Sequence, residues 1–244
     1  MKEFYLTQKN LFLEFIHFLR APKLNQHTAP LSFNIIISIF CFTFFIQFLN
    51  IFINHYSTFI IDKISTVNID NRVKDYDSLP IELKVLFACV LAPVLEEVSM
   101  RLNLYPKWKN AFLAIIVFGI SILFFTTRAF GNLYFHHGIN LKQIDIFFWL
   151  LVAIISFGFV IANQRLGNRY YGIYFYLVAI IFSVMHGRDY IHDFTSLLLV
   201  FAYYLSHFIF GLAMGFLRVK NGICASILGH MFYNSLLTVV KLLN

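Results

Sequence analysis

The chain has 244 residues, of which 59% are hydrophobic, 19% aromatic and 13% charged. An average soluble domain is about half apolar and about one quarter charged, so this composition excludes an ordinary soluble globule, a disordered chain and a collagen-like fibre. The formal net charge is +7, but most Lys and Arg residues lie in short connectors between apolar runs. Membrane topology explains that distribution, and we expect no nucleic-acid partner.

The first thirty residues, 1–30, precede the first long apolar run and are expected to form a cytoplasmic or interfacial segment. Phe12, Phe15, Ile16 and Leu19 recur at helical spacing, with charged residues on the other faces. This pattern is typical of an amphipathic helix at a membrane interface, and an ordinary surface helix would show it equally.

The apolar runs that follow predict an all-α, polytopic bundle of about seven transmembrane helices, because roughly 20 apolar residues cross the hydrocarbon core of a bilayer. The predicted spans are residues 31–53, 80–105, 111–127, 144–163, 171–186, 194–217 and 223–243. Only the first and fourth have the composition of a straightforward span. The others contain charged, His or Asn side chains, which are costly in lipid unless they face a protein interior, so these interruptions indicate function.

The connectors between the spans predict the domain organisation and the topology. Residues 54–79 form the longest polar connector and are expected to be a solvated loop. No connector is long enough for a separate soluble core, so residues 31–244 are expected to form a single membrane-embedded domain. Of the Lys and Arg residues outside the spans, more lie in connectors on the same side of the membrane as the N-terminus. This bias predicts an integral multi-pass membrane protein whose N-terminus is cytoplasmic. We expect the membrane to be the plasma membrane.

The three cysteines, Cys41, Cys89 and Cys224, lie far apart inside apolar runs. Neither a disulfide framework nor a zinc knuckle has this spacing. We therefore expect the cysteines to be packing residues.

The first polar motif lies inside the second predicted span, where Glu96 and Glu97 are followed by Arg101. On a helix Glu97 and Arg101 are neighbours one turn apart and can pair, while Glu96 points about 100° away. A carboxylate in a low-dielectric site can serve as a water-activating base or as an acid. Pro93 is expected to free a backbone carbonyl before the pair. A charge cluster that merely ends the span is the alternative interpretation.

Two further motifs place polar side chains in later spans. His186 ends an apolar helix one turn after Phe182, and His230 and Asn234 share one helical face in the last span. Each could be a structural hydrogen-bonding group, as we expect for His207 in the middle of its span. Because these groups and the Glu pair occur on three spans with few other polar partners, we predict that they converge at one site.

In chain order, the three motifs resemble those of the CPBP intramembrane endopeptidases, the CAAX protease and bacteriocin-processing family also called Abi. The resemblance covers residues 83–237 approximately. It implies a membrane endopeptidase in which Glu96 activates a water molecule with the help of His186. It also implies that His230 and Asn234 stabilise the oxyanion that forms when water attacks the peptide carbonyl.

Glu97 and Arg101 match the remaining charged positions of the family motif. We assign them to orienting the site, because their ion pair can hold one helix face while Glu96 stays available. The catalytic type stays open: Glu96, His186 and His230 could instead ligate Zn²⁺. The sequence has no HExxH helix, however, so we favour a glutamate-activated water without metal or other cofactor.

Helix geometry raises one difficulty for a shared site. A rise of 1.5 Å per residue puts Glu96 and His186 at depths that differ by about 15 Å. A displaced span boundary, a helix break near Pro93 or a site near mid-depth would each remove this conflict.

A second class of function is a noncatalytic membrane protein, such as an immunity factor, a scaffold or a transporter, that keeps the polar cluster for folding or binding. The complete motif set argues against it, and a transporter should show paired halves with matching broken helices, which the sequence lacks. The expected partners are the lipid bilayer and a peptide or membrane-anchored protein substrate. By resemblance, the substrate classes include prenylated CaaX proteins, peptide pheromones and bacteriocin-related peptides.

Overall fold

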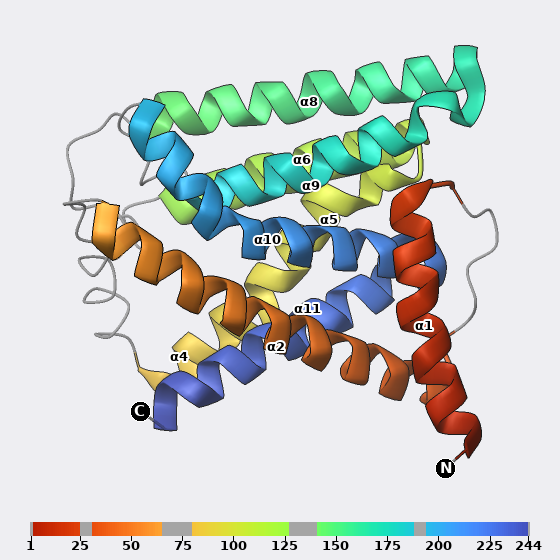
Figure 1. Ribbon diagram of the computed structural model, residues 1–244. Coiled ribbons are helices and arrows are strands. Elements are labelled where there is room, and N and C mark those ends of the chain that lie inside the picture. The colour runs from red at the N-terminus through yellow and green to blue at the C-terminus, as the bar shows by residue number, and fades with distance from the viewer. Residues whose placement is uncertain (1, 25–30, 65–79, 127–140, 188–193, 244) are drawn as a thin grey trace. The chain divides into compact units, whose positions relative to one another are not determined.

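The computed structural model of the protein describes residues 2–24, 31–64, 80–126, 141–187 and 194–243. All regular secondary structure in these ranges is helical (Figure 1), which confirms the predicted all-α class for this part of the chain. The elements in chain order are α1 (Lys2–Arg20), α2 (Phe33–Ile64), α4 (Ile81–Leu86), the π-helix η2 (Phe87–Leu91), α5 (Ala92–Arg101), the 3₁₀ helix η3 (Leu102–Leu104), α6 (Trp108–Thr126), α8 (Leu141–Leu166), the 3₁₀ helix η4 (Gly167–Tyr170), α9 (Tyr171–Gly187), α10 (Phe194–Asn221) and α11 (Ile223–Leu243).

Every predicted span coincides with a helical stretch, but the helices differ in how well they suit a bilayer. By length and composition, two candidate membrane spans stand out among the described residues, Phe33–Ile53 and Ile223–Val240. Shorter apolar helices cover Trp108–Ser121, Leu150–Leu166 and Tyr171–His186. The predicted helices are therefore present, whereas seven membrane crossings stay a prediction.

Helix α2 corrects one prediction about the connectors. It continues to Ile64, so residues 54–64 are helical and the solvated loop predicted from residue 54 is wrong over this stretch. The stretch contains neither Gly nor Pro and includes the consecutive apolar residues Phe59, Ile60 and Ile61, so it holds no helix-stop signal. The rest of that connector, residues 65–79, lies outside the described residues.

The second predicted span is an interrupted helix in which α4, η2 and α5 follow one another without a loop. In the π-helical stretch the Ala92 N–H donates to the Phe87 carbonyl, five residues earlier. The next N–H in line would come from Pro93, which has none. The helix therefore changes its geometry just before Pro93, close to the position where the sequence suggested a break.

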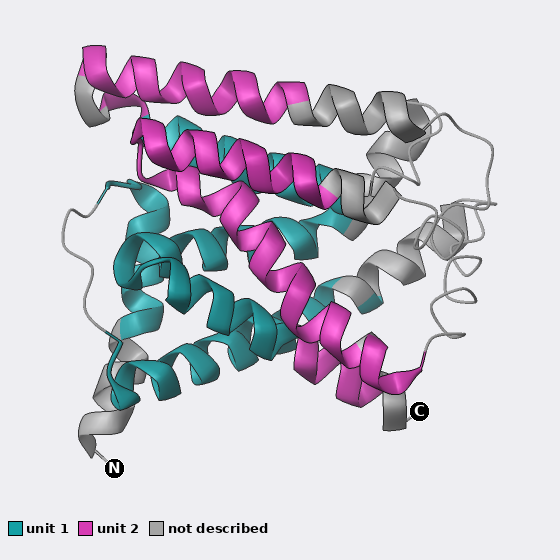
Figure 2. Cartoon of the chain, turned by 180° about the vertical axis from the view of Figure 1, so that it is seen from behind, with its two compact units in different colours: residues 1–69, 171–233 teal, residues 70–170, 234–244 magenta. Residues whose placement is uncertain are grey.

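The chain forms two compact units, coloured separately in Figure 2. Unit 1 comprises Met1–Ile69 and Tyr171–Tyr233, and unit 2 comprises Asp70–Tyr170 and Asn234–Asn244. In unit 1, α10 packs against α9 and α2, and α1 packs against α2 and α10. In unit 2, α6 packs against α5 and α8. Helix α11 contributes its first half to unit 1 and its second half to unit 2.

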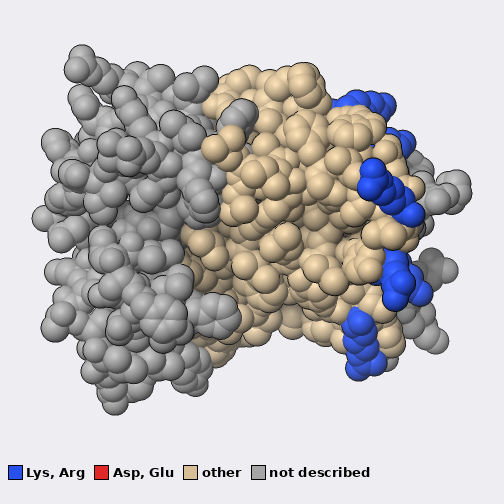
Figure 3. Space-filling model, turned by 90° about the horizontal axis from the view of Figure 1, so that it is seen from above, with Lys and Arg blue, Asp and Glu red and all other residues tan. Residues whose placement is uncertain are grey.

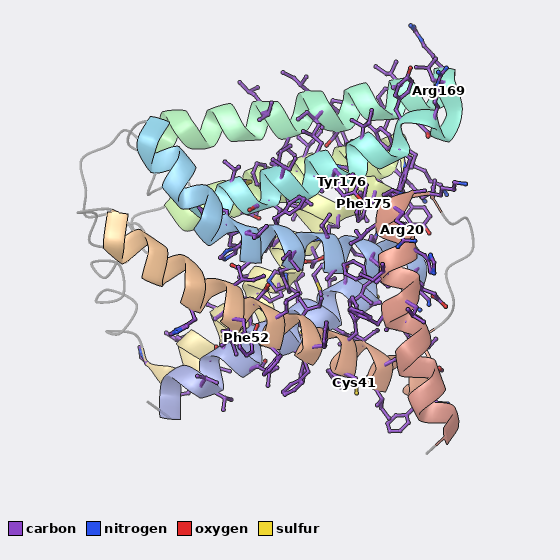
Figure 4. The ribbon with its side chains drawn as sticks, viewed as in Figure 1. Arg20, Cys41, Phe52, Arg169, Phe175 and Tyr176 are labelled. Atoms are coloured by element: carbon purple, nitrogen blue, oxygen red, sulfur yellow. The ribbon has the colours of Figure 1, made fainter. Side chains whose placement is uncertain are left out.

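Aromatic rings form much of the contact between α1 and the rest of unit 1. The Phe15 ring lies 5.3 Å from both Phe42 of α2 and Phe216 of α10, and the Phe18 ring lies 4.9 Å from Phe175 of α9. The Tyr176 hydroxyl donates to the Leu19 carbonyl. Figure 4 labels Phe175 and Tyr176 near Arg20, where α1 ends against α9.

The apolar residues of α1 do not all face the same way, although the sequence pattern had suggested that they do. Leu11 and Phe15 are buried, whereas Phe12 and Ile16 are exposed. One apolar side of α1 is thus used within unit 1. The exposed side carries both apolar and charged residues, so a place at the membrane interface stays a prediction.

Helix α2 presents a wide apolar surface away from the unit 1 core. Its exposed large side chains are Phe44, Phe45, Phe48, Leu49, Ile51 and Phe52. Cys41, which Figure 4 labels with Phe52, is exposed on the same helix and Cys224 is exposed on α11, while Cys89 is buried. Such a surface is suited to lipid, because a soluble monomer rarely exposes a continuous apolar patch of this extent.

Candidate functional site

The carboxylates of the first motif lie on α5, in unit 2. Glu97 and Arg101 form an ion pair one helical turn apart, as predicted. Both side chains are fully buried, with 0% and 1% of their surface exposed. Glu96 is partly exposed on the neighbouring face of the helix. Because Arg101 compensates the charge of Glu97 inside the protein, the pair fixes the face of α5 from which Glu96 projects.

Asn234 lies against the π-helix of the same unit. Its Nδ2 atom donates a hydrogen bond to the Ala88 carbonyl oxygen at 2.8 Å. That carbonyl is the one whose helical donor is missing, because the Ala92 N–H already bonds to Phe87 and Pro93 has no N–H. Asn234 thus supplies the donor for a carbonyl that has no backbone N–H donor within its own helix.

A second contact joins this part of α11 to the π-helix. The Thr238 hydroxyl donates to the Asn234 carbonyl at 2.9 Å, and the Cys89 thiol lies 3.4 Å from the Thr238 hydroxyl. Cys89 is therefore a packing and hydrogen-bonding residue in unit 2, in keeping with its predicted role. These contacts fix the helical position of Asn234.

His186 lies at the end of α9, in unit 1. Its Nδ1 atom is 2.8 Å from the Phe182 carbonyl oxygen one turn earlier. A carbonyl can only accept, so Nδ1 carries the proton and the lone pair of the ring lies on Nε2. This tautomer suits both a base that receives a proton from water and a histidine that ligates a metal.

Three histidines of unit 1, His186, His207 and His230, lie in one cluster with aromatic side chains. The His186 ring stacks on the His207 ring of α10 with centroids 4.8 Å apart. The Phe182 ring lies 4.3 Å from His186 and 6.3 Å from His230, and Phe210 lies 4.7 Å from His230. We call these five residues the histidine cluster. The structure therefore brings two of the predicted site residues, His186 and His230, into one neighbourhood.

His207, for which the sequence favoured a structural hydrogen bond between helices, lies against the predicted site. Its ring stacks on His186, and its Nδ1 lies 3.4 Å from the Ser206 hydroxyl; the interhelical hydrogen bond itself stays a prediction. The sequence signal for this contact was a His residue in the middle of a predicted span. Its partner could not be identified, because the register between α9 and α10 depends on how they pack.

The first half of α11 approaches its neighbours unusually closely at Gly229. A Cβ at this position would lie 2.9 Å from Leu217 Cδ1, 3.1 Å from Met214 Sδ and 3.2 Å from Thr43 Oγ1. A larger residue here would require the ends of these three side chains to shift. Gly229 precedes His230, which is 3% exposed, so the close packing determines where the His230 ring lies.

Basic side chains collect at one end of the helices of unit 1. Arg20 is the last residue of α1 and Lys23 follows it, at the point where Pro22 lies beside Gly172 at the start of α9. Lys220, at the end of α10, forms an ion pair with Glu14 of α1, and burial lowers the pKa of the Lys220 ammonium. Gly222 then turns the chain into α11 with φ at 93°, a conformation that only glycine adopts readily.

A similar group of basic residues occurs in unit 2. Lys107 and Lys109 flank the start of α6, and Arg165 and Arg169 lie at the end of α8 and in η4; all four are exposed. The ring contact of 5.8 Å between Trp108 and Phe157 places the start of α6 beside the last part of α8. In the face shown in Figure 3, Lys and Arg are the charged side chains visible among the described residues.

One set of buried polar residues was missed by the sequence analysis. Thr43, Gln47 and Asn50 lie in the first predicted span, whose composition is that of a straightforward membrane helix, and all three are buried. The available signal was their spacing of four and three residues, which puts them on one helical face. An average over the whole span hides such a stripe.

The site residues thus form two groups: the histidine cluster in unit 1, and Glu96, the Glu97–Arg101 pair and Asn234 in unit 2. Together they define a class, a helical membrane protein with acid–base residues in its apolar helices. The family model described as type II CAAX prenyl endopeptidase Rce1-like matches residues 161–236. This match confirms the predicted resemblance to the CPBP family and supports a CAAX-protease-like membrane endopeptidase. Comparison with curated proteins and with solved structures gives no match.

The matched segment contains the second and third motifs, with His186, His207, His230 and Asn234. The first motif lies before it. The roles of individual residues within the site therefore stay predictions that rest on their geometry.

Proposed function

We propose that the protein is an intramembrane endopeptidase that hydrolyses a peptide bond with a water molecule activated by Glu96. The observation that carries this proposal is the grouping of His186 with His230 around the Phe182 ring in the histidine cluster. The Nδ1 atom of His186 lies 2.8 Å from the Phe182 carbonyl oxygen; this contact orients the ring, and we assign proton transfer to Nε2. Its neighbour in the cluster, His230, is buried among aromatic rings. Both residues lie in the segment that the family model matches.

In this mechanism the Glu96 carboxylate takes a proton from water while the water oxygen bonds to the carbonyl carbon of the peptide. His186 assists by receiving or supplying a proton at Nε2. His230 and Asn234 donate hydrogen bonds to the oxyanion. The proton then passes to the departing amine, which breaks the C–N bond. Asn234 has two N–H groups, and one donates to Ala88, so the oxyanion would receive the other.

A metal mechanism is the alternative that the sequence motifs leave open. In the part of the chain that the structure describes, no three His, Cys, Asp or Glu side chains are grouped so that they could hold a metal ion. In that alternative, Glu96, His186 and His230 would hold Zn²⁺, which would supply a water molecule of lowered pKa. We favour the metal-free reaction because His230 and Asn234, at a spacing of four residues on α11, would provide two donors for the oxyanion. A chelator distinguishes the two mechanisms directly: metal-free cleavage survives it, and zinc-dependent cleavage is lost and returns on addition of Zn²⁺.

The substrate class that we propose is a prenylated peptide with a C-terminal CaaX sequence, as the description of the matched family indicates. The test uses purified protein in liposomes and an internally quenched peptide with a farnesylated cysteine followed by three residues. We expect cleavage after the cysteine, identified by mass spectrometry, and at least tenfold slower cleavage of the same peptide without farnesyl. Equal rates would reject prenyl recognition, and no cleavage of either peptide would reject CaaX peptides as the substrate class.

For the topology, we propose that the N-terminus and the basic helix ends lie on the cytoplasmic side of the plasma membrane. In unit 1 the ends of α1 and α10 carry Lys and Arg, and in unit 2 the start of α6 and the end of α8 do so. All these positions belong to connectors that the sequence assigns to the inner side, in agreement with the positive-inside rule. Labelling of a single cysteine placed at Lys23 or at Lys109, from either side of sealed vesicles, tests the assignment.

A noncatalytic role remains the second candidate, because the Asn234 amide and the Glu97–Arg101 pair both serve the fold of unit 2. On that hypothesis the purified protein cleaves no peptide, and Glu96→Gln leaves any cellular phenotype unchanged. The liposome assay therefore distinguishes the two candidates.

A further inference from the structure

Helix α2 carries a stripe of buried polar side chains on the side that faces the core of unit 1. Thr43, Gln47 and Asn50 follow one another at spacings of four and three residues, and their exposed fractions are 0%, 5% and 1%. The exposed phenylalanines, such as Phe44 and Phe48, occupy the opposite side of the helix. We call Thr43, Gln47 and Asn50 the polar stripe.

The polar stripe contains hydrogen-bonding atoms that its surroundings do not satisfy. Thr43 Oγ1, Gln47 Oε1 and Asn50 Oδ1 are buried and have no hydrogen-bond partner within the described part of the chain. Each buried polar atom left without a partner costs about 1–3 kcal/mol. Apolar side chains would avoid this cost inside a membrane helix. The stripe is therefore suited to a ligand that supplies donors.

The stripe runs beside the part of α11 that carries His230. Asn50 Nδ2 lies 3.0 Å from the Tyr233 hydroxyl, and Thr43 Oγ1 lies 3.2 Å from where a Cβ on Gly229 would be. These two contacts flank His230 along the helix. The Tyr233 ring also lies 4.2 Å from Phe210, a member of the histidine cluster. Helix α2 thus places Gln47 Oε1 and Asn50 Oδ1 beside the segment of α11 that carries His230, within unit 1.

The chemistry of the stripe indicates the class of ligand. Amide oxygens accept hydrogen bonds from N–H groups, and the stripe has no carboxylate that would favour a metal ion. From Thr43 to Asn50 the helix rises about 10 Å, which is the length of about three residues of extended peptide. A peptide that enters an apolar helical protein must have its own backbone N–H groups paired.

We infer that the polar stripe is a binding subsite for the backbone N–H groups of an extended peptide substrate. This inference rests on the proposed function and adds the residues that hold the substrate beside the histidine cluster. Thr43, Gln47 and Asn50 bind and orient the peptide, and they take no part in proton transfer.

The test measures equilibrium binding, so that it does not depend on turnover. The probe is a fluorescent farnesylated peptide that ends in cysteine and three further residues, titrated with the Glu96→Gln protein in nanodiscs. Gln47→Met and Asn50→Leu, made in this background, are expected to raise Kd about tenfold each. Ser38→Ala is the matched control on α2, because the Ser38 hydroxyl donates to the Asn34 carbonyl of its own helix at 2.8 Å, and it should leave Kd unchanged.

Backbone-modified peptides make the test specific. In each analogue, one amide N–H of the last three residues is replaced by an ester oxygen, which removes a donor without adding bulk. At one position or more the ester should raise Kd about tenfold with the Glu96→Gln protein and have little further effect with Gln47→Met or Asn50→Leu. Equal penalties in parent and variants, or no penalty at any position in the unmutated stripe, would overturn the inference. The ester series on the parent protein needs no variant of the stripe to fold.

The outcomes also separate this inference from the proposed function. Specific binding through the stripe, without cleavage by the protein that retains Glu96, would reject the peptidase and keep the subsite. Cleavage by that protein, with Kd insensitive to the stripe and to the esters, would reject the subsite alone. Absence of peptide binding and of cleavage would reject both.

Discussion

The polar groups of the two units are buried to a similar degree, but they are satisfied differently. In unit 2 they pair with one another: Glu97 with Arg101, and the Asn234 amide with the Ala88 carbonyl. In unit 1 the acceptors of the polar stripe face α11 without a partner among the described residues, and His186 keeps its Nδ1 proton on its own helix. Apart from Glu96 and the second N–H group of Asn234, the polar groups of unit 2 therefore stabilise the fold, whereas we propose that those of unit 1 serve the substrate.

The largest expected effect that this comparison predicts concerns His186. Replacement by Ala removes the Nε2 group proposed for proton transfer, so kcat/KM should fall about 10²–10⁴-fold with little change in thermal stability. His207→Ala removes only the stacked neighbour and should cost about tenfold or less. Cleavage of the farnesylated peptide in liposomes measures both. His55→Ala, on the exposed part of α2, is the control. If the His186 variant kept its activity but lost stability, His186 would have a structural role and the proposed difference between the two units would be rejected.

The second prediction tests the structural role of the ion pair in unit 2. Arg101→Met leaves the buried Glu97 carboxylate without its partner and should lower the free energy of unfolding by about 3–5 kcal/mol. Adding Glu97→Leu to this variant should restore most of the stability, because no buried charge then remains. Denaturant unfolding in detergent micelles measures both variants. Arg169→Gln, at an exposed position, should change stability little; a similarly small effect of Arg101→Met would contradict the assignment.

A smaller effect is expected where α11 packs against α2 and α10. Gly229→Ala introduces a Cβ within 3.2 Å of Leu217, Met214 and Thr43, and overpacking of this kind costs about 1–3 kcal/mol. Because His230 is the next residue, cleavage should fall together with stability. The matched control is Gly158→Ala in α8, where a Cβ would meet no atom within 4 Å and helix propensity should slightly raise stability. If Gly229→Ala and Gly158→Ala changed stability and cleavage equally, the close packing of α11 at Gly229 would not be needed.

The smallest predicted effect concerns the contact between α1 and the end of α10. Glu14→Gln removes the partner of Lys220, and because Glu14 is half exposed, the loss should be less than about 1 kcal/mol and should shrink at high salt. Thermal unfolding of the variant at low and high ionic strength measures it. A loss of several kcal/mol would mean that the ion pair, rather than the packing of Phe15 and Phe18, attaches α1 to unit 1.

The helices and the local pairs could be predicted from sequence, because they depend on short-range periodicity. The apolar runs gave the helix positions, and the spacing of Glu97 and Arg101 gave their ion pair. Residues 54–64 were the exception: their polar side chains suggested a loop, yet no Gly or Pro ends α2 before Ile64. A polar composition indicates that a segment is exposed to water, whereas the length of a helix depends on where residues such as Gly and Pro end it.

The contacts between helices could not be predicted, because they depend on register. The stacking of His207 on His186 needs the alignment of α9 with α10. The bond from Asn234 to Ala88 needs both the alignment of α11 with η2 and a π-helix, which Pro93 suggests but does not specify. The polar stripe was missed for a different reason, since a strongly apolar span hides three polar residues when only its average is considered.

The most direct test of the central claim is the Glu96→Gln substitution, assayed for cleavage of the farnesylated peptide in liposomes alongside the unchanged protein. The substitution keeps the size of the side chain and removes the group that would accept the proton from water. We predict that the unchanged protein cleaves the peptide in the presence of a chelator, and that the variant binds the peptide normally but cleaves it at least about 10²–10⁴-fold more slowly. Cleavage at an unchanged rate by the variant would contradict the account.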